Sequence, residues 1–176
     1  MLKLKIGIFL LIEKLLRFCV HPHLRAHILR FLGATVGRNV RIYEITLINL
    51  NNGFRNLIIE DDVHIGTDCL IDLAGRVYLH KGATLSPQVT IITHSDPGIK
   101  HNSPLAKIYP PETGNVEIGE YTWLGAGVTV LKGVKIGCRS VVGAGSIVNK
   151  DIPPNVVAVG MPARVIRYLE LPEGVG

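Results

Sequence analysis

Branched aliphatic residues recur every six positions in the second half of the chain. Written in sixes from Ile118, the sequence reads IGEYTW, LGAGVT, VLKGVK, IGCRSV, VGAGSI and VNKDIP, and each hexad begins with Ile, Leu or Val. Glycine is the second residue in four of the six hexads, and the fifth residue is always small or β-branched. A period of six matches neither an α-helix nor a single strand, whose faces repeat every 3.6 and 2 residues. The pattern predicts short strands and corners, stacked into coils around one aliphatic column.

Similar hexads occur upstream, beginning at Val36. Their phase slips by two residues between Ile71 and Leu79, and residues 42–58 and 95–117 break the pattern. The glycine or small residue after each aliphatic is expected to let the chain turn. We therefore expect a repeat domain that contains one long excursion loop.

The first 34 residues follow a different pattern, in which Lys and Arg alternate with Leu, Ile and Phe. Glu13, Lys14 and Arg17 interrupt the apolar block, which argues against a cleaved signal peptide or a membrane-spanning helix. The pattern predicts a basic amphipathic helix, or two helices broken at His21-Pro22. Such a segment either packs against its own domain or a neighbouring subunit, or contacts a membrane surface through residues 1–30.

Composition narrows the function classes. The chain is 47% hydrophobic but only 6% aromatic, so the core must be mainly aliphatic. The net charge of +5 fits an anionic ligand or a lipid surface. Basic residues are not clustered or interleaved with aromatics, so we expect no nucleic-acid partner. The three cysteines are odd in number, widely spaced and without a CxxC motif, which favours a reducing, cytoplasmic location and argues against a structural metal site.

The hexads resemble those of the hexapeptide-repeat acyltransferases, and two further segments extend the likeness. LRFLGATVGRNVRI (29–42) and VVGAGSIVNKDIPPNVVAVGMPARVIR (141–167) look like parts of small sugar and surface-polysaccharide O-acetyltransferases. The resemblance implies an all-β fold, a left-handed parallel β-helix at 35–167, with a short helical segment at 1–34 and a C-terminal tail at 168–176. It also implies a homotrimer that binds acetyl-CoA between neighbouring prisms. The implied reaction is acetyl transfer to a hydroxyl of a sugar or polysaccharide precursor, in the cytoplasm or at the inner membrane surface.

His94 is the candidate catalytic residue. It ends the alternating run VTIITH immediately before the long break, where the resemblance implies a general base. A sugar hydroxyl is a weak nucleophile, and neutral imidazole, whose ordinary pKa is about 6.5, can accept its proton at cellular pH. Asp72, about one coil earlier, is a candidate for orienting the imidazole or binding the acceptor. Asp96, two residues after His94, is a second candidate for the same role.

The resemblance assigns acetyl-CoA to the later coils. An aromatic and backbone groups are expected to contact the pantetheine arm, and cations are expected to bind the phosphates, a task that suits arginine. No resident metal is expected. The candidate cofactor-binding residues are Trp123, Ala126, Ala144, Asn149, Lys150, Arg164 and Arg167.

Two other functions stay open at this point. The acceptor group is either a hydroxyl or an amine, as in an amino sugar or a xenobiotic, because the loop at 95–117 carries no readable specificity motif. A non-catalytic or zinc-dependent β-helix protein is the other alternative. A zinc site would require His64, His80 and His94 to meet, although their spacings of 16 and 14 do not match an 18-residue coil.

Overall fold

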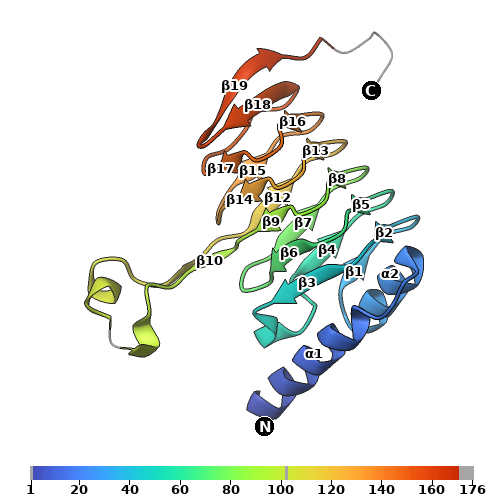
Figure 1. Cartoon of the computed structure of the whole chain (residues 1–176), viewed down its shortest axis with the longest axis vertical. Helices are drawn as coiled ribbons and strands as arrows, with labels where there is room; N and C mark the ends of the chain where they lie inside the picture. The colour runs from blue at the N-terminus through green and yellow to red at the C-terminus, as the bar shows by residue number, and fades with distance from the viewer. Residues whose placement is uncertain (1, 102, 171–176) are drawn as a thin grey trace.

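The computed structural model describes residues 2–101 and 103–170. The chain forms an elongated stack of coils with two helices at its N-terminal end and a long loop projecting from one side (Figure 1). Each coil contributes one short strand to each of three sheets, which we call A, B and C. Strands of successive coils pair in parallel and in register, as Leu124 does with Leu85 and Val142. The predicted parallel β-helix is therefore confirmed.

Each sheet extends along the prism from the N-terminal coil onward. Sheet A consists of β1 (Thr35–Val36), β4 (Leu57–Ile59), β7 (Val77–Leu79), β12 (Val116–Ile118) and β15 (Lys135–Ile136). Sheet B consists of β2 (Arg41–Ile42), β5 (His64–Ile65), β8 (Thr84–Leu85), β13 (Trp123–Leu124), β16 (Val141–Val142), β18 (Val156–Gly160) and β19 (Ala163–Tyr168). Sheet C consists of β3 (Ile45–Ile48), β6 (Cys69–Asp72), β9 (Thr90–Ile91), β14 (Thr129–Val130) and β17 (Ile147–Val148).

The aliphatic column lies where the hexads predict it. The first residues of the six C-terminal hexads are completely buried, and the fifth residues are at most 6% exposed. Each hexad thus sends two side chains into the prism, which accounts for a core of mostly Val, Ile and Leu. The first-position residues are Ile118, Leu124, Val130, Ile136, Val142 and Val148.

The second-position glycines have a different role from the predicted one. The backbone turns two residues later, at the fourth position, where Tyr121 and Arg139 both have φ of 55°. The glycine is required because neighbouring coils approach too closely for a side chain. A Cβ on Gly137 would lie 2.4 Å from the backbone nitrogen of Pro154 in the following coil. Glycine at this position therefore permits stacking, and the fourth residue makes the corner.

The N-terminal segment forms two helices, α1 (Leu2–Leu16) and α2 (Pro22–Phe31), as the predicted break at His21-Pro22 requires. His21 caps α2, because its Nδ1 accepts a hydrogen bond from the backbone N–H of Leu24. The second helix packs on β1 and β2 and covers the first coil, and its own Leu29 is fully buried in this contact. The open end of the β-helix is thereby closed.

Arg25 fixes the two helices to the prism. Its side chain is only 3% exposed, and it donates hydrogen bonds to three backbone carbonyls. Two of these belong to Leu16, at 3.2 Å, and Cys19, at the end of α1; the third belongs to Ile42 of β2, at 2.9 Å. One buried guanidinium thus joins both helices to the first coil.

The excursion loop leaves and re-enters the prism through a short antiparallel pair. β10 (His94–Ser95) pairs with β11 (Glu112–Thr113), and the loop beyond carries η2 (Ile99–His101) and η3 (Pro104–Lys107). β12 begins at Val116, so its first two residues lie inside the predicted break at 95–117.

The earlier break and the tail also contain regular structure. Residues 42–58 include β3, the 3₁₀ turn η1 (Leu50–Asn52) and the start of β4. The hexad pattern fails there because the corner between the two strands is longer than usual. At the other end, β19 extends to Tyr168, and the N–H of Leu169 donates to the carbonyl of Asn155. The remainder of the predicted tail, residues 171–176, lies outside the described residues.

Candidate active site

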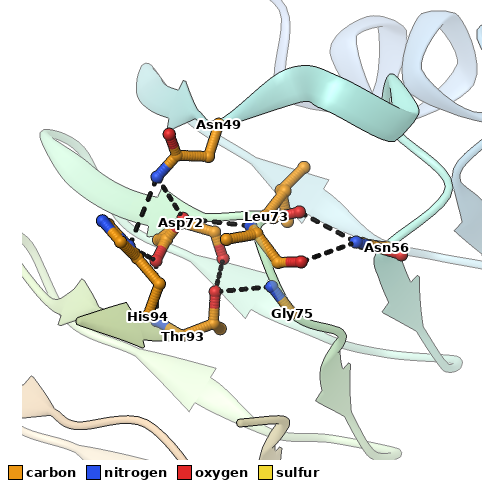
Figure 2. A network of polar contacts seen from close by, with 8 residues as sticks. Asn49, Asn56, Asp72, Leu73, Gly75, Thr93 and His94 are labelled. Carbon is orange, nitrogen blue, oxygen red and sulfur yellow. Dashed lines mark hydrogen bonds and ion pairs between the residues drawn. The ribbon is translucent and has the colours of Figure 1, made fainter. Parts of the chain in front are cut away.

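Three successive coils each contribute one polar residue to the same edge of the prism. This edge, where the chain passes from sheet C to sheet A, is called the C–A edge. Asn49 follows β3, Asp72 ends β6, and His94 follows β9. Strand pairing stacks these three strands in register, with Ile48 opposite Asp72 and Ile71 opposite Ile91. Residues up to 45 positions apart therefore meet in one cluster (Figure 2).

Asp72 lies at the centre of the cluster and contacts the imidazole directly. The distance between His94 Nδ1 and Asp72 Oδ2 is 2.5 Å, and Asn49 Nδ2 donates to Asp72 Oδ1 at 2.8 Å (Figure 2). The Asp72 side chain is completely buried, whereas the His94 side chain is 34% exposed. The histidine is thus anchored from inside the prism and accessible from outside.

Asp72 is held as a carboxylate. Its burial raises the pKa, but hydrogen bonds from His94, Asn49 and two backbone N–H groups outweigh this effect and leave the pKa below its ordinary value. The backbone donors are Thr93, 2.8 Å from Oδ2, and Ala74, 3.0 Å from Oδ1. An ionised carboxylate with this many donors only accepts hydrogen bonds.

The charge of Asp72 determines which nitrogen of His94 carries the proton. Because the carboxylate is an acceptor, Nδ1 must be the protonated nitrogen and must donate to it. Asn49 Nδ2, itself a donor, lies 3.3 Å from the same Nδ1, so its hydrogen bond goes to Asp72 rather than to the ring. Nε2 of the neutral imidazole is left with a free lone pair. This arrangement allows His94 to accept a proton from a bound acceptor.

The corner around Asp72 is braced by further hydrogen bonds. Thr93 Oγ1 donates to the Asp72 carbonyl at 3.0 Å and accepts from the Gly75 N–H at 2.9 Å. Asn56 Nδ2 donates to the carbonyl of Leu73 at 2.8 Å (Figure 2). These contacts join three coils and fix the position from which Asp72 reaches the imidazole.

Asp96 contacts its own loop instead of the imidazole. Its Oδ1 accepts hydrogen bonds from the backbone N–H groups of Gly98, at 2.8 Å, and Ile99, at 2.9 Å. This is an Asx-type turn that shapes the start of the excursion loop. Of the two candidate carboxylates, Asp72 is therefore the one that orients His94.

The candidate cofactor residues occupy three parts of the prism. Asn149 and Lys150 follow β17 and are exposed on the C–A edge, two coils beyond His94. Ala126 and Ala144 are exposed at the B–C edge, where the chain passes from sheet B to sheet C. The remaining three belong to sheet B and are exposed on its surface: Trp123 in β13, and Arg164 and Arg167 in β19.

This distribution separates the candidate base from most of the candidate cofactor residues. In a prism with three sides, the C–A edge lies opposite sheet B. The Trp123 indole is half exposed and donates from Nε1 to Ser86 Oγ at 2.9 Å, which holds the ring against sheet B. His94 and the three candidate residues of sheet B therefore lie on different sides of one prism.

The other two histidines of the prism lie apart from His94. The ring of His64, on β5, lies 5.4 Å from the ring of Tyr43. His80 follows β7 and bridges two carboxylates, with Nδ1 3.0 Å from Glu60 and Nε2 3.0 Å from Glu117. Within one chain, the three histidines of the zinc hypothesis therefore do not converge.

Asn49 is the member of the cluster that sequence reasoning missed. It lies inside the 42–58 break, where the hexad pattern cannot assign it to a corner. The available signal was its place after the alternating run ITLI, one coil before Asp72. Asn49 also has φ of 57°, a left-handed conformation that asparagine adopts more readily than most residues.

Comparison with known proteins gives the same family from sequence and from structure. A family model described as Bacterial transferase hexapeptide (six repeats) matches residues 115–150. The galactoside O-acetyltransferase of Escherichia coli (strain K12) is 35% identical over 149 residues, which cover 82% of this chain and 68% of the relative. A maltose O-acetyltransferase structure from Clostridium difficile 630 has a TM-score of 0.71 and 28% identity, covering 94% of this chain and 86% of the other.

A second solved structure is described as galactoside acetyltransferase in complex with coenzyme A. It is 32% identical, has a TM-score of 0.63, and covers 91% of this chain and 80% of its own. These matches include the coils that carry Asn49, Asp72 and His94, since they span most of the chain. The chain belongs to the hexapeptide-repeat acetyltransferases.

Proposed function

We propose that this protein transfers an acetyl group from acetyl-CoA to a hydroxyl of a sugar or polysaccharide precursor. The observation that carries the proposal is the His94–Asp72 pair at the base of the excursion loop, with its imidazole partly exposed. Relatives named for galactoside and maltose O-acetylation, and a relative structure in complex with coenzyme A, support both substrates.

The proposed reaction is a direct transfer. His94 Nε2 removes the proton from the acceptor hydroxyl while the oxygen attacks the thioester carbonyl carbon. The C–S bond then breaks, and the imidazolium returns the proton to the CoA thiolate. Asp72 stabilises the imidazolium and keeps Nε2 available, as the acid of a catalytic triad does. A positioned base of this kind contributes about 10²–10⁴-fold to the rate.

The proposed cofactor site requires a second chain. Arg164 and Arg167 suit the phosphates of acetyl-CoA, and Trp123, Ala126 and Ala144 suit its pantetheine arm. These residues lie on sheet B or the B–C edge, away from His94 of the same chain. In a homotrimer, the C–A edge of one prism faces the sheet B side of its neighbour. Asn149 and Lys150 then line the groove from the side that carries His94.

Calorimetric titration with acetyl-CoA tests the cofactor site. We expect about one site per subunit, weakened at least tenfold in Arg164→Ala/Arg167→Ala and unchanged in His94→Ala. The His94→Ala variant is expected to lose acetyl transfer while keeping this affinity. Sedimentation of the protein should give the mass of three chains. A monomer that binds acetyl-CoA, or binding that does not respond to the arginine variant, would contradict the proposed groove.

Acceptor chemistry is tested with matched sugars. We expect transfer to galactosides or maltosides and little transfer to the corresponding amino sugars, since the relatives that support the proposal are named for O-acetylation. Faster transfer to the amine would favour the amino-sugar alternative. Failure to bind acetyl-CoA at millimolar concentration would contradict the proposed transfer and favour a non-catalytic or zinc-dependent function.

We also propose that α1 lies on the cytoplasmic surface of the inner membrane. None of the helices in residues 2–101 and 103–170 is both long and apolar enough to cross a bilayer. The helix nevertheless carries an exposed apolar stripe at helical spacing that begins at Leu4, 71% exposed, and continues to Phe18, 82% exposed, two residues after the helix ends. The stripe also contains Ile8, Leu11 and Leu15.

Charge favours an anionic lipid surface as the partner of this stripe. On an α-helix, with 100° between successive residues, Lys5 and Lys14 fall on opposite sides of the stripe. Both lysines are exposed. Lysines that flank an apolar face are typical of interfacial helices, in which they reach the headgroups.

Vesicle flotation tests this contact. We expect the protein to float with phosphatidylglycerol-containing vesicles, and Leu11→Asp/Leu15→Asp to abolish flotation. Leu105→Asp, at an equally exposed site in the excursion loop, is the matched control. If the α1 variant floats like the unmodified protein, the stripe does not bind lipid; if it loses the trimer instead, the stripe is a subunit contact.

A further inference from the structure

A cationic cleft lies beside the candidate active site, between α1 and sheet A. Its volume is about 770 Å³, and it is lined by three basic residues, Lys5, Arg55 and Arg76. Phe9 of α1 and Tyr78 of β7 form part of its apolar wall. The basic residues come from α1, from the corner after η1 and from the residue before β7, so the fold gathers three cations from separate segments.

Among the described residues, the three cations have no acidic partners. Across residues 2–101 and 103–170, Lys5, Arg55 and Arg76 form no ion pair, and the cleft lining contains no carboxylate. Arg76 Nη1 donates to Tyr78 Oη at 3.3 Å, which turns the guanidinium toward the aromatic wall. All three side chains are exposed. Like charges gathered without counter-charges create a positive potential that attracts an anion.

The cleft adjoins the His94 cluster through the η1 corner. Asn49, at the start of this corner, binds Asp72, and Asn56, at its end, lines the cleft and binds the carbonyls of Leu73 and Ala74. Figure 2 shows Asn49 hydrogen-bonded to Asp72 and Asn56 hydrogen-bonded to Leu73 of the same corner. Arg76 follows Asp72 by four residues, so their Cα atoms are at most about 14 Å apart. The cleft and the His94 cluster therefore lie on either end of the segment 72–76, which Asn49 and Asn56 hold by hydrogen bonds.

We propose that the cleft binds a phosphate group carried by the acceptor. The inference rests on the proposed acetyl transfer and specifies its substrate class as a phosphorylated or diphosphate-linked sugar. Two guanidinium groups and one ammonium group suit phosphate, because guanidinium donates paired hydrogen bonds to its oxygens. The aromatic wall formed by Phe9 and Tyr78 then contacts either the sugar or the group on the other side of the phosphate. Two kinds of acceptor carry such a phosphate group: a soluble sugar phosphate, and a sugar phosphate attached to a lipid.

Binding of inorganic pyrophosphate tests the cleft independently of catalysis. Calorimetry is performed in the Arg164→Ala/Arg167→Ala background, so that the proposed CoA phosphate site does not contribute. We expect saturable binding that is weakened about tenfold or more by Arg55→Gln and by Arg76→Gln. Arg41→Gln, an exposed arginine on sheet B, is the control. Absence of binding at millimolar pyrophosphate, or binding that ignores both cleft arginines, would overturn the proposal.

Acetyl transfer to matched acceptors tests the link to the active site. Methyl glucoside and glucose 1-phosphate differ in the phosphate, and we expect a KM about tenfold or more lower for the phosphate. Arg76→Gln should remove this preference while leaving the KM for methyl glucoside unchanged. Equal KM values in the unmodified protein would overturn the link. If no sugar is acetylated while the arginines still control pyrophosphate binding, the proposed function fails and the anion site stands.

A third comparison identifies the source of the phosphate. The same hexose phosphate is supplied free or joined to a polyprenyl chain in phosphatidylcholine vesicles. Preference for the free sugar phosphate assigns a soluble acceptor. Preference for the polyprenyl form that Leu11→Asp/Leu15→Asp removes assigns a membrane-bound acceptor. Both results support a phosphate-bearing acceptor, whereas acetylation of neither form, alongside transfer to methyl glucoside, would contradict it.

Discussion

His94 Nδ1 lies 2.5 Å from Oδ2 of the completely buried Asp72, although 22 residues separate them in the sequence. The contact is made by stacking: β6 and β9 pair in parallel, so the end of one coil lies above the end of the next. Asp72 fixes the tautomer of His94 because its carboxylate accepts only hydrogen bonds. The orientation of the base is thus a consequence of coil register.

Asp72→Asn tests whether Asp72 orients the His94 imidazole without contributing to the binding of acetyl-CoA. The amide can donate to Nδ1, which would move the imidazole proton to Nε2 and remove the base. We expect kcat to fall about 10²–10⁴-fold while the affinity for acetyl-CoA is unchanged. Steady-state kinetics and calorimetry measure the two quantities. Asp96→Asn is the control, since Asp96 only shapes a loop turn; equal losses in both variants would mean that Asp72 does not act through the imidazole.

The stability of the protein should depend on the ionisation of Asp72. Its pKa in the folded protein lies below its ordinary value, which is about 3.9 in an unfolded chain. The ionised form therefore adds stability above that value, and this contribution is lost as the pH falls through the lower, folded-state pKa. We expect the difference in free energy of unfolding between the unmodified protein and Asp72→Asn to shrink as the pH falls from about 5 toward 3, a range below that in which an imidazole ordinarily titrates. A difference that grows between about pH 5 and 3 would mean that Asp72 is protonated in the native state.

Much of the fold can be predicted from the sequence because the prism repeats one short-range rule. Each hexad buries its first and fifth residues, so the column from Ile118 to Val148 is visible as a pattern. The start of α2 is equally local, since Pro22 suits the first turn of a helix and His21 can cap it.

The site is less predictable because it depends on contacts between coils. His94 and Asp72 are found from their positions beside the loop, but Asn49 sits where the hexad phase is lost. The cleft is harder still to predict, because Lys5, Arg55 and Arg76 share no spacing and meet only when α1 packs on the η1 corner. The close-packing role of the second-position glycines is also not visible in the sequence, because it too depends on a contact between coils.

Gly137→Ala tests the close-packing role of these glycines. A Cβ there would lie 2.4 Å from the backbone nitrogen of Pro154, and a backbone neighbour cannot move aside as a flexible side chain can. We expect a loss of about 1–3 kcal/mol of stability in urea unfolding. Gly7→Ala is the matched control: it lies in α1 with no atom within 4 Å, so the same change should stabilise the helix by up to about 1 kcal/mol. Equal effects at both sites would show that coil stacking does not select glycine.

Arg25→Met tests whether the N-terminal helices are held by one buried side chain. The methionine keeps most of the apolar volume but removes the guanidinium donor from the carbonyls of Cys19 and Ile42, and leaves Leu16 with only the backbone N–H of Cys19. Unsatisfied buried carbonyls are costly, and we expect a loss of at least about 2 kcal/mol, measured as a lower urea midpoint with an unchanged slope.

Arg38→Met is the control for this substitution. Arg38 belongs to the first coil, between β1 and β2, but its side chain is 89% exposed and pairs with Asp61 at the surface. A surface ion pair contributes little, so the urea midpoint should hardly move. Limited proteolysis locates the damage: cleavage between α1 and α2 in Arg25→Met, with the coils intact, would mean that the helices detach from a stable prism. Loss of the whole prism in one transition would mean that the helical cap is required for the first coil to fold.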